Sequence, residues 1–305
     1  MNPEGSVLPL PVAARRGILR GLLLSARPKQ WLKNGALLAA LVFSRRGERL
    51  GSVTREAAAV LIFCALVSAV YLFNDILDRD RDRLHPEKRF RPIASGELSI
   101  AAAAVAAALL AAAGLGGAAL LARPFAGASA AYLVLQLAYS LWVKHWVLLD
   151  VFAIAAGFVL RVVAGALAIA VPISNWLYLC TLLLALFLAL AKRRAELSTL
   201  EGEAEAHRKN LALYSLPLLD QLIAIVSACT ILAYSLYTLA PETVQKFGTD
   251  GLKFTVPCVL FGLFRYLFLV HRRGAGGSPE KVLLGDGPLF ADVILFVTLV
   301  VWVLY

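Results

Sequence analysis

The chain has 305 residues, of which 60% are hydrophobic, and a formal net charge of +10. Its mean hydropathy is +0.76. Soluble domains are about 45–50% apolar, so this composition excludes an ordinary soluble globular protein. In a membrane protein, basic loops set the orientation and meet anionic lipid headgroups, so we expect a lipid bilayer and no nucleic acid as partner. The four cysteines and four histidines are dispersed, without the spacing of a zinc or redox site.

Apolar runs of about 20 residues, the length that crosses about 30 Å of hydrocarbon, recur along the chain. We therefore predict an all-α integral membrane protein with nine transmembrane helices. A cytoplasmic N-terminal segment, residues 1–24, precedes a single polytopic membrane domain, residues 25–305. The predicted spans are residues 30–43, 55–74, 99–122, 125–143, 147–171, 174–191, 217–240, 254–270 and 288–305.

Lysine and arginine are concentrated on one side of the predicted spans, and this side should be the cytoplasm. The bias places the N-terminus and the long loops 75–98 and 192–216 inside. The basic loop 44–55 lies outside and is the exception. We expect a multi-pass protein of the cell inner (plasma) membrane whose active site faces the cytoplasm.

The second predicted span runs into an acidic segment. If the helix continues, Asn74, Asp75, Asp78 and Asp82 share one face at the edge of the membrane. Carboxylates at this spacing repel one another, so they favour a bound cation, and hard oxygen ligands favour Mg²⁺. Three interleaved arginines leave a solvated, salt-bridged loop as the alternative. Asp80 lies off this face and should pair with arginine.

The fifth predicted span contains Arg161 within an apolar run. A charge at that depth costs about 2.5–3.5 kcal/mol on insertion scales, so Arg161 is a candidate functional residue. Asp150, Gly157, Arg161 and Gly165 fall along one helical face. Arg161 could therefore hold a phosphate, or it could form a structural ion pair with Asp150 or with an acid on another helix.

Further charged and polar residues gather at the predicted cytoplasmic helix ends. They would form a basic funnel suited to several phosphates, although orientation by basic loops also explains part of the set. These candidate substrate-binding residues are Lys29, Lys33, Asn34, Asn74, Lys88, Arg89, Arg91, Asp150, Lys192, Arg193 and Glu196.

The acidic pattern, N-D-x-x-D-x-x-x-D, resembles the first aspartate-rich motif of the UbiA superfamily of intramembrane prenyltransferases. Usual members carry a second D-x-x-x-D motif after the sixth helix, and residues 192–216 contain none. The chain resembles instead the decaprenyl-phosphate phosphoribosyltransferase branch of that superfamily. The stretches that support this resemblance are residues 27–34, 85–96, 139–145 and 157–161.

The resemblance implies a helical bundle around a central cavity open to the cytoplasmic side, with a role in cell-wall synthesis. It implies Mg²⁺ held by Asn74, Asp75, Asp78 and Asp82. We expect Asp75, Asp78 and Asp82 to be catalytic together with Arg161, the candidate from the fifth span. Tyr139 and Lys144, in one of the matching stretches, join the substrate-binding set.

The implied reaction is transfer of a 5-phosphoribosyl group from 5-phosphoribosyl diphosphate to a polyprenyl (decaprenyl-type) phosphate. A prenyltransferase acting on an aromatic acceptor and a lipid transporter are the alternatives. The oligomeric state is left open between a monomer and a homo-oligomer.

Overall fold

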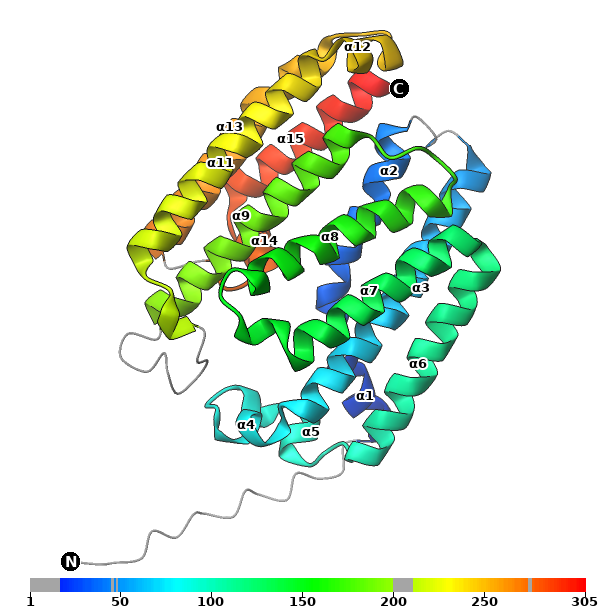
Figure 1. Cartoon of the computed structure of the whole chain (residues 1–305), viewed down its shortest axis with the longest axis vertical. Coiled ribbons are helices and arrows are strands. Elements are labelled where there is room, and N and C mark those ends of the chain that lie inside the picture. The colour runs from blue at the N-terminus through cyan, green and yellow to red at the C-terminus, as the bar shows by residue number, and fades with distance from the viewer. Residues whose placement is uncertain (1–16, 45–46, 48, 200–210, 274–275) are drawn as a thin grey trace, which may run out of the picture. The chain divides into compact units, whose positions relative to one another are not determined.

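A computed structural model describes residues 17–44, 47, 49–199, 211–273 and 276–305, and these residues form helices and no strand (Figure 1). The predicted all-α class is thus confirmed for this part of the chain. The elements in chain order are α1 (Ile18–Ala26), η1 (Pro28–Leu37), α2 (Leu38–Phe43), α3 (Leu50–Leu77), α4 (Arg79–Leu84), η2 (Lys88–Phe90), α5 (Pro92–Ser95), α6 (Ile100–Leu121), α7 (Arg123–Leu141), η3 (Val143–His145), α8 (Leu149–Ala168), α9 (Asn175–Thr199), η4 (Leu211–Leu213), α11 (Leu216–Leu239), α12 (Pro241–Phe247), η5 (Gly251–Thr255), α13 (Val256–Arg273), α14 (Pro279–Gly285) and α15 (Gly287–Leu304).

Seven segments of the described chain are long and apolar enough to cross a bilayer, which confirms a multi-pass membrane protein. They comprise α3, α6, α8, α9, α11, α15, and η5 together with α13. Two predicted spans are not among the seven. Residues 30–43 form the 3₁₀ segment η1 followed by the short helix α2, and residues 125–143 lie largely in α7, which has 19 residues. The total of nine spans therefore stays a prediction.

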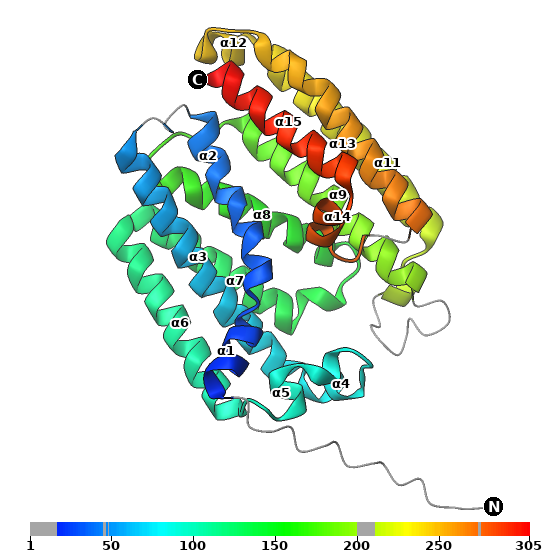
Figure 2. The same ribbon diagram turned by 180° about the vertical axis from the view of Figure 1, so that it is seen from behind.

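The chain divides into two compact units. The first unit comprises residues 1–31 and 64–114. Its small core joins Leu72 of α3, Ile93 of α5 and Ala103 of α6, and Leu22 of α1 packs against this core. The helix α1 lies beside α5, as Figure 2 shows from behind. This packing holds the end of α3, and with it the acidic segment, against the loop that follows.

The second unit comprises residues 32–63 and 115–305. Its largest core lies between α8, α9, α11 and α13, where Phe187 and Tyr266 meet edge to face at 5.4 Å. The helix α8 packs between α7 and α9, and α9 packs on α11 (Figure 1). Small buried residues of α8, among them Ala155, Gly157 and Gly165, allow its neighbours to approach closely.

Candidate active site

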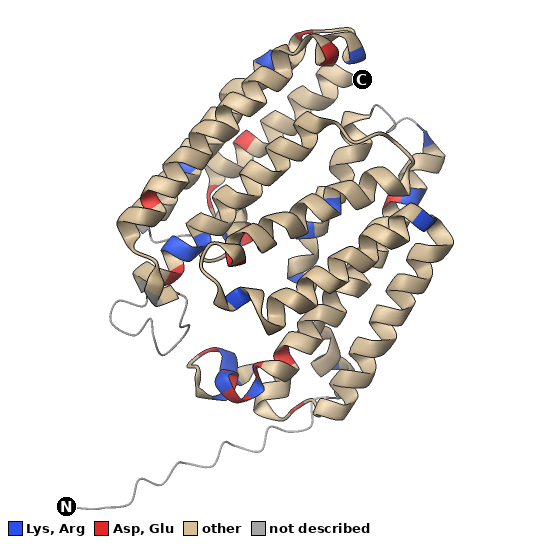
Figure 3. Cartoon of the chain, viewed as in Figure 1, with Lys and Arg blue, Asp and Glu red and all other residues tan. Residues whose placement is uncertain are grey.

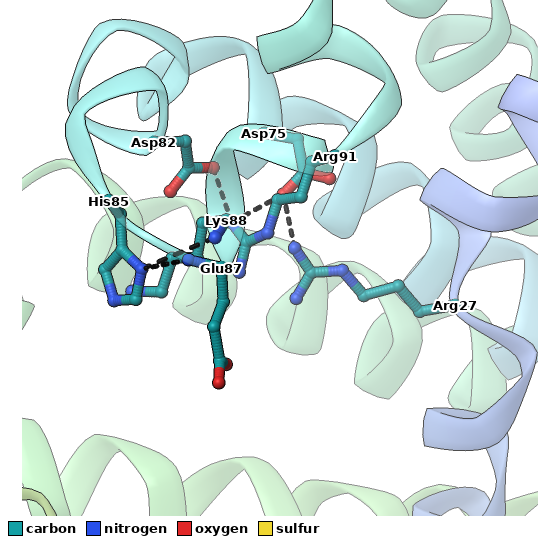
Figure 4. A network of polar contacts seen from close by, with 7 residues as sticks. All are labelled: Arg27, Asp75, Asp82, His85, Glu87, Lys88 and Arg91. Carbon is teal, nitrogen blue, oxygen red and sulfur yellow. Dashed lines mark hydrogen bonds and ion pairs between the residues drawn. The ribbon is translucent and has the colours of Figure 1, made fainter.

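The acidic segment forms a buried ion-pair cluster in the first unit (Figure 4). Asp75 at the end of α3 and Asp82 in α4 are 2% and 4% exposed. One nitrogen of Arg91, Nη1, lies 3.2 Å from Asp75 Oδ1 and 2.6 Å from Asp82 Oδ2. Arg27 forms a second ion pair with Asp75. Two carboxylates thus converge on a single cationic group.

The turn between α3 and α4 brings these two carboxylates together. α3 ends at Leu77, and Asp78 has φ −91° and ψ 4° before α4 begins at Arg79. The amides of Asp78 and Asp82 still donate to the carbonyls four residues earlier, at 2.9 and 2.8 Å. The helical spacing therefore persists across the turn, as the sequence pattern predicted.

Arg27 is a residue of this cluster that the candidate set did not contain. It has φ 52°, in the left-handed region where a residue with a side chain is strained. Its guanidinium lies 4.8 Å from the centroid of the Tyr71 ring, while Ser68 Oγ donates to the Ala26 carbonyl at 3.2 Å. The strained turn directs Arg27 toward Asp75. The sequence did contain one indication of its importance: Arg27 is the first residue of stretch 27–34, which supports the family resemblance.

The other polar residues of the motif differ in their surroundings. Asn74 Oδ1 is buried and has no hydrogen-bond partner among the described residues. Asp78 is half-buried, and the exposed Asp80 lies 4.0 Å from Arg83, the arginine pairing expected for it. The alternative interpretation, a solvated loop with salt bridges to the interleaved arginines, does not hold for Asp75 and Asp82. Both side chains are buried, and their partners are Arg27 and Arg91.

These residues fit a magnesium ion that is shared with a substrate. The nitrogen of Arg91 already lies where one cation reaches both carboxylates, and Asn74 adds an unpartnered oxygen. Within the described ranges, no group of three or more His, Cys, Asp or Glu side chains could hold a metal ion. Mg²⁺ commonly takes one or two carboxylates and completes its shell with water and substrate phosphates. The ion itself stays a prediction.

A second centre, in the second unit, surrounds Arg161. Its side chain is buried in α8, at 5% exposure. Arg161 Nε donates to Asn34 Oδ1 at 3.1 Å, Nη1 to the Gly157 carbonyl at 3.0 Å and Nη2 to Tyr132 Oη at 2.7 Å. All three of these acceptors are uncharged. A guanidinium has five N–H groups, so this cation retains capacity for an anion.

The suggested ion pair between Arg161 and Asp150 is wrong. The two residues are eleven positions apart on α8, which is about 16 Å along the axis at 1.5 Å per residue. Asp150 Oδ2 accepts instead from Arg193 Nε of α9, at 2.7 Å. A shared helical face therefore did not imply contact.

Arg193 is the centre of a third polar group, also in the second unit. It is 1% exposed, and beyond Asp150 it donates to Glu196 and, at 3.1 Å, to Tyr139 Oη. Lys192 lies 3.8 Å from Glu196. The structure thus brings five predicted substrate-binding residues together. Every nitrogen of Arg193 already has a protein acceptor, and its bond to Asp150 joins α9 to α8.

Tyr214 completes this group and was not among the candidates. Its hydroxyl accepts from the Leu148 amide at 2.7 Å and donates to Asp150 Oδ1 at 2.7 Å. Leu148 has φ 66°, so the bond holds a strained residue at the start of α8. Burial, followed by the bond to Asp150, raises the pKa of the Tyr214 phenol, which keeps it a hydrogen-bond donor.

The remaining candidates lie nearer the surface. Lys29, Lys88 and Arg89 are exposed, whereas Lys33 and Lys144 are half-buried. Lys33 Nζ lies 4.0 Å from Glu280 Oε2. Charged residues gather mainly at the ends of the helices, which is the distribution that a chain crossing a bilayer requires (Figure 3).

The amino-acid sequence of this chain is similar to that of known proteins. The sequence profile of the UbiA prenyltransferase family matches residues 36–304. The decaprenyl-phosphate phosphoribosyltransferase of Mycobacterium tuberculosis is 33% identical over 275 residues, covering 88% of this chain and 89% of that protein. The protein of the same name from Corynebacterium glutamicum is 32% identical over 302 residues, covering 95% and 88%.

Solved structures share the fold. A UbiA homolog from Archaeoglobus fulgidus, bound to GPP and Mg²⁺, superposes with a TM-score of 0.69. The alignment covers 93% of this chain and 99% of that one at 21% sequence identity. A UbiA homolog from Aeropyrum pernix K1 gives a TM-score of 0.62 at 18% identity, over 93% of this chain and 98% of that one.

Proposed function

Because the chain belongs to the UbiA prenyltransferase family and is a transferase, we propose the reaction that its relatives are named for. It transfers a 5-phosphoribosyl group from 5-phosphoribosyl diphosphate to a polyprenyl phosphate of the decaprenyl type, and releases diphosphate. The observation that carries this proposal is the extent of the likeness, since about nine-tenths of both chains align with the Mycobacterium tuberculosis relative.

The acidic cluster serves the leaving group. Asp75 and Asp82, with Asn74 and Asp78, would hold Mg²⁺ together with the diphosphate. When bound, the ion would supply positive charge to the diphosphate leaving group. Arg27 and Arg91 then pass from carboxylate partners to phosphate partners, since an arginine fork binds both kinds of oxygen.

Arg161 serves the acceptor. The nucleophile is an oxygen of the lipid phosphate, which is already anionic at neutral pH and forms the new bond to ribose C1. No strong general base is needed, because the nucleophile does not lose a proton in the step. A buried guanidinium with spare N–H groups binds this phosphate and neutralises part of its charge.

The Asp150–Arg193 group supports the fold around the acceptor centre. It fixes α8, which carries Arg161, against α9 and Tyr214. The isoprenoid tail lies in the hydrocarbon region among the apolar helices, and the charged groups face the cytoplasmic side. Residues Lys29, Lys33, Lys88, Arg89, Lys144 and Lys192 attract the anionic substrates.

A prenyl transfer to an aromatic acceptor is the second candidate, and the family description favours it. It uses the same acidic motif and also releases diphosphate. The absence of any aspartate between residues 192 and 216 counts against it, because usual family members carry a second aspartate motif there.

The test uses the purified full chain in detergent with polyprenyl phosphate, Mg²⁺ and radiolabelled 5-phosphoribosyl diphosphate. We expect label in the lipid phase for the wild type, and none after EDTA or with Asp82→Ala. Asp80→Ala is the matched control, because the Asp80 side chain is 89% exposed and off the buried cluster. Turnover of a prenyl diphosphate with an aromatic acceptor, and no labelled lipid, would overturn the proposed substrates.

A further inference from the structure

A buried carboxyl group lies outside every site described so far. Glu56 of α3 is 0% exposed, and neither of its carboxyl oxygens has a hydrogen-bond partner among the described residues. An ionised carboxylate is costly in an apolar interior, and ionisable groups in membrane spans are usually paired or functional. Glu56 belongs to the second unit and is not part of the acidic motif.

Glu56 lies beside a helix crossing that only glycine permits. A Cβ atom on Gly165 of α8 would be 2.3 Å from the Leu37 carbonyl oxygen and 2.7 Å from Glu56 Oε1. The carboxyl group and this carbonyl therefore border the same small space. A neutral carboxylic acid has an O–H donor, and a backbone carbonyl has two lone pairs, of which a helical bond uses one.

The neighbouring cation does not neutralise Glu56. Arg55 Nε donates to the Ala168 carbonyl at 3.0 Å, and Nη2 donates to the Leu121 carbonyl at 2.9 Å. These bonds hold this end of α3 against the end of α8. The Leu37 carbonyl and the Gly165 backbone, which border the same space as Glu56, carry no charge.

The crossing at Gly165 sets the position of the Arg161 centre. Gly165 is four residues, about one turn, after Arg161 on α8, and Leu37 is three residues after Asn34 on η1. The contact between Leu37 and Gly165 is therefore one turn from the hydrogen bond between Asn34 and Arg161. A hydrogen-bond donor that holds the Leu37 carbonyl in place would therefore also hold Asn34, one turn away, at its distance from Arg161.

We propose that Glu56 is protonated in the folded protein, that it donates a hydrogen bond to the Leu37 carbonyl, and that it thereby positions Asn34 against Arg161. Glu56 is then a positioning residue, which never touches substrate. Its protonation is independent of the reaction, whereas its effect on turnover rests on the proposed function.

Infrared spectroscopy of the full chain tests the protonation. The difference between wild type and Glu56→Gln should contain the carbonyl stretch of a protonated carboxylic acid, shifted in deuterated water. Glu242→Gln is the matched control: the exposed Glu242 accepts a hydrogen bond from the Trp176 indole at 2.7 Å, and its removal should leave that band intact. If Glu56→Gln instead removes the signal of an ionised carboxylate, the proposal is overturned. Glu56 would then be charged and stabilised by a cation or water in the space beside Gly165.

Steady-state kinetics test the positioning. Glu56→Gln keeps an N–H donor and should leave the KM for polyprenyl phosphate within about twofold of wild type, whereas Glu56→Leu should raise it about tenfold, the effect of one lost hydrogen bond. The KM for 5-phosphoribosyl diphosphate should not change. The positioning role would be refuted if Glu56→Leu lowered only the yield of active protein and left both KM values unchanged. If even the wild type shows no turnover, the proposed function fails while the infrared result still decides the state of Glu56.

Discussion

Gly165 and Leu37 are in such close contact that a methyl group on Gly165 would lie 2.3 Å from the Leu37 carbonyl oxygen. Such a distance requires the backbone to move, because a carbonyl cannot rotate away as a flexible side chain can. The crossing of η1 and α8 therefore depends on the absence of a side chain at one position.

Gly165→Ala should lower the free energy of unfolding by about 1–3 kcal/mol, the usual cost of overpacking a well-packed interior. The thermal unfolding midpoint of the purified protein in detergent measures this change. Gly127→Ala in α7 is the control, because a Cβ atom there meets nothing within 4 Å. Equal midpoints for both variants would mean that η1 does not contact α8 as the structure has it.

Replacement of Arg91 should make the stability of the protein depend on Mg²⁺. Arg91→Gln leaves Asp75 and Asp82 without the nitrogen that they share, so the apo protein is destabilised and the two oxygens are released for a cation. Binding to the folded state alone adds about 2.7 kcal/mol at a ligand concentration 100 times Kd. Unfolding midpoints measured across a Mg²⁺ titration should rise more steeply for this variant than for wild type.

The exposed Arg81→Gln is the control for this titration, and it should follow the wild-type curve. A flat response of Arg91→Gln to Mg²⁺ would show that Asp75 and Asp82 are structural ion-pair partners and not metal ligands.

Arg161→Lys should separate charge from geometry at the acceptor centre. Lysine keeps the positive charge but cannot bond Asn34, Tyr132 and the Gly157 carbonyl from one planar group. We expect kcat/KM for polyprenyl phosphate to fall by about 10- to 100-fold, since one or two charge-assisted hydrogen bonds are lost. Arg123→Lys, at an exposed position, should leave it unchanged. Wild-type kinetics for Arg161→Lys would exclude Arg161 from phosphate recognition.

Tyr214→Phe should destabilise the protein by about 1–3 kcal/mol, because the Leu148 amide and the Asp150 carboxylate each lose a partner. The folded-state pKa of Tyr214 is raised, so the contribution of its hydroxyl is complete below the unfolded value of about 10 and is lost as the pH rises through the folded value. Unfolding midpoints from pH 6 to 11 should show a constant gap that narrows only at the alkaline end.

Tyr178→Phe is the control, because Tyr178 is 46% exposed on α9. A gap between wild type and Tyr214→Phe that narrows already below neutral pH would contradict the assignment of the phenol as the donor.

The acidic motif shows how much of the candidate site local sequence predicts. Asp75 and Asp82 are seven residues apart, two helical turns, so helical periodicity alone predicted that they share a face. The same reasoning could not find Arg27, which is 48 residues away from Asp75 and reaches it through a left-handed turn. Nor could it identify Glu56, since a glutamate near the start of an apolar run resembles an interfacial anchor.

Composition and run length were enough to predict an all-helical, multi-pass membrane protein, because transfer free energy into hydrocarbon is nearly additive along a segment. The likeness to the UbiA family came from the acidic motif at residues 74–82 and the other matching stretches. Only the tertiary structure decided which charges meet. Arg161 bonds Asn34, 127 residues away, and Asp150 bonds Arg193, 43 residues away, because the rotation and register of packed helices select the partners. That selection depends on the close packing of residues such as Gly165 against Leu37, and a pattern along one helix does not contain it.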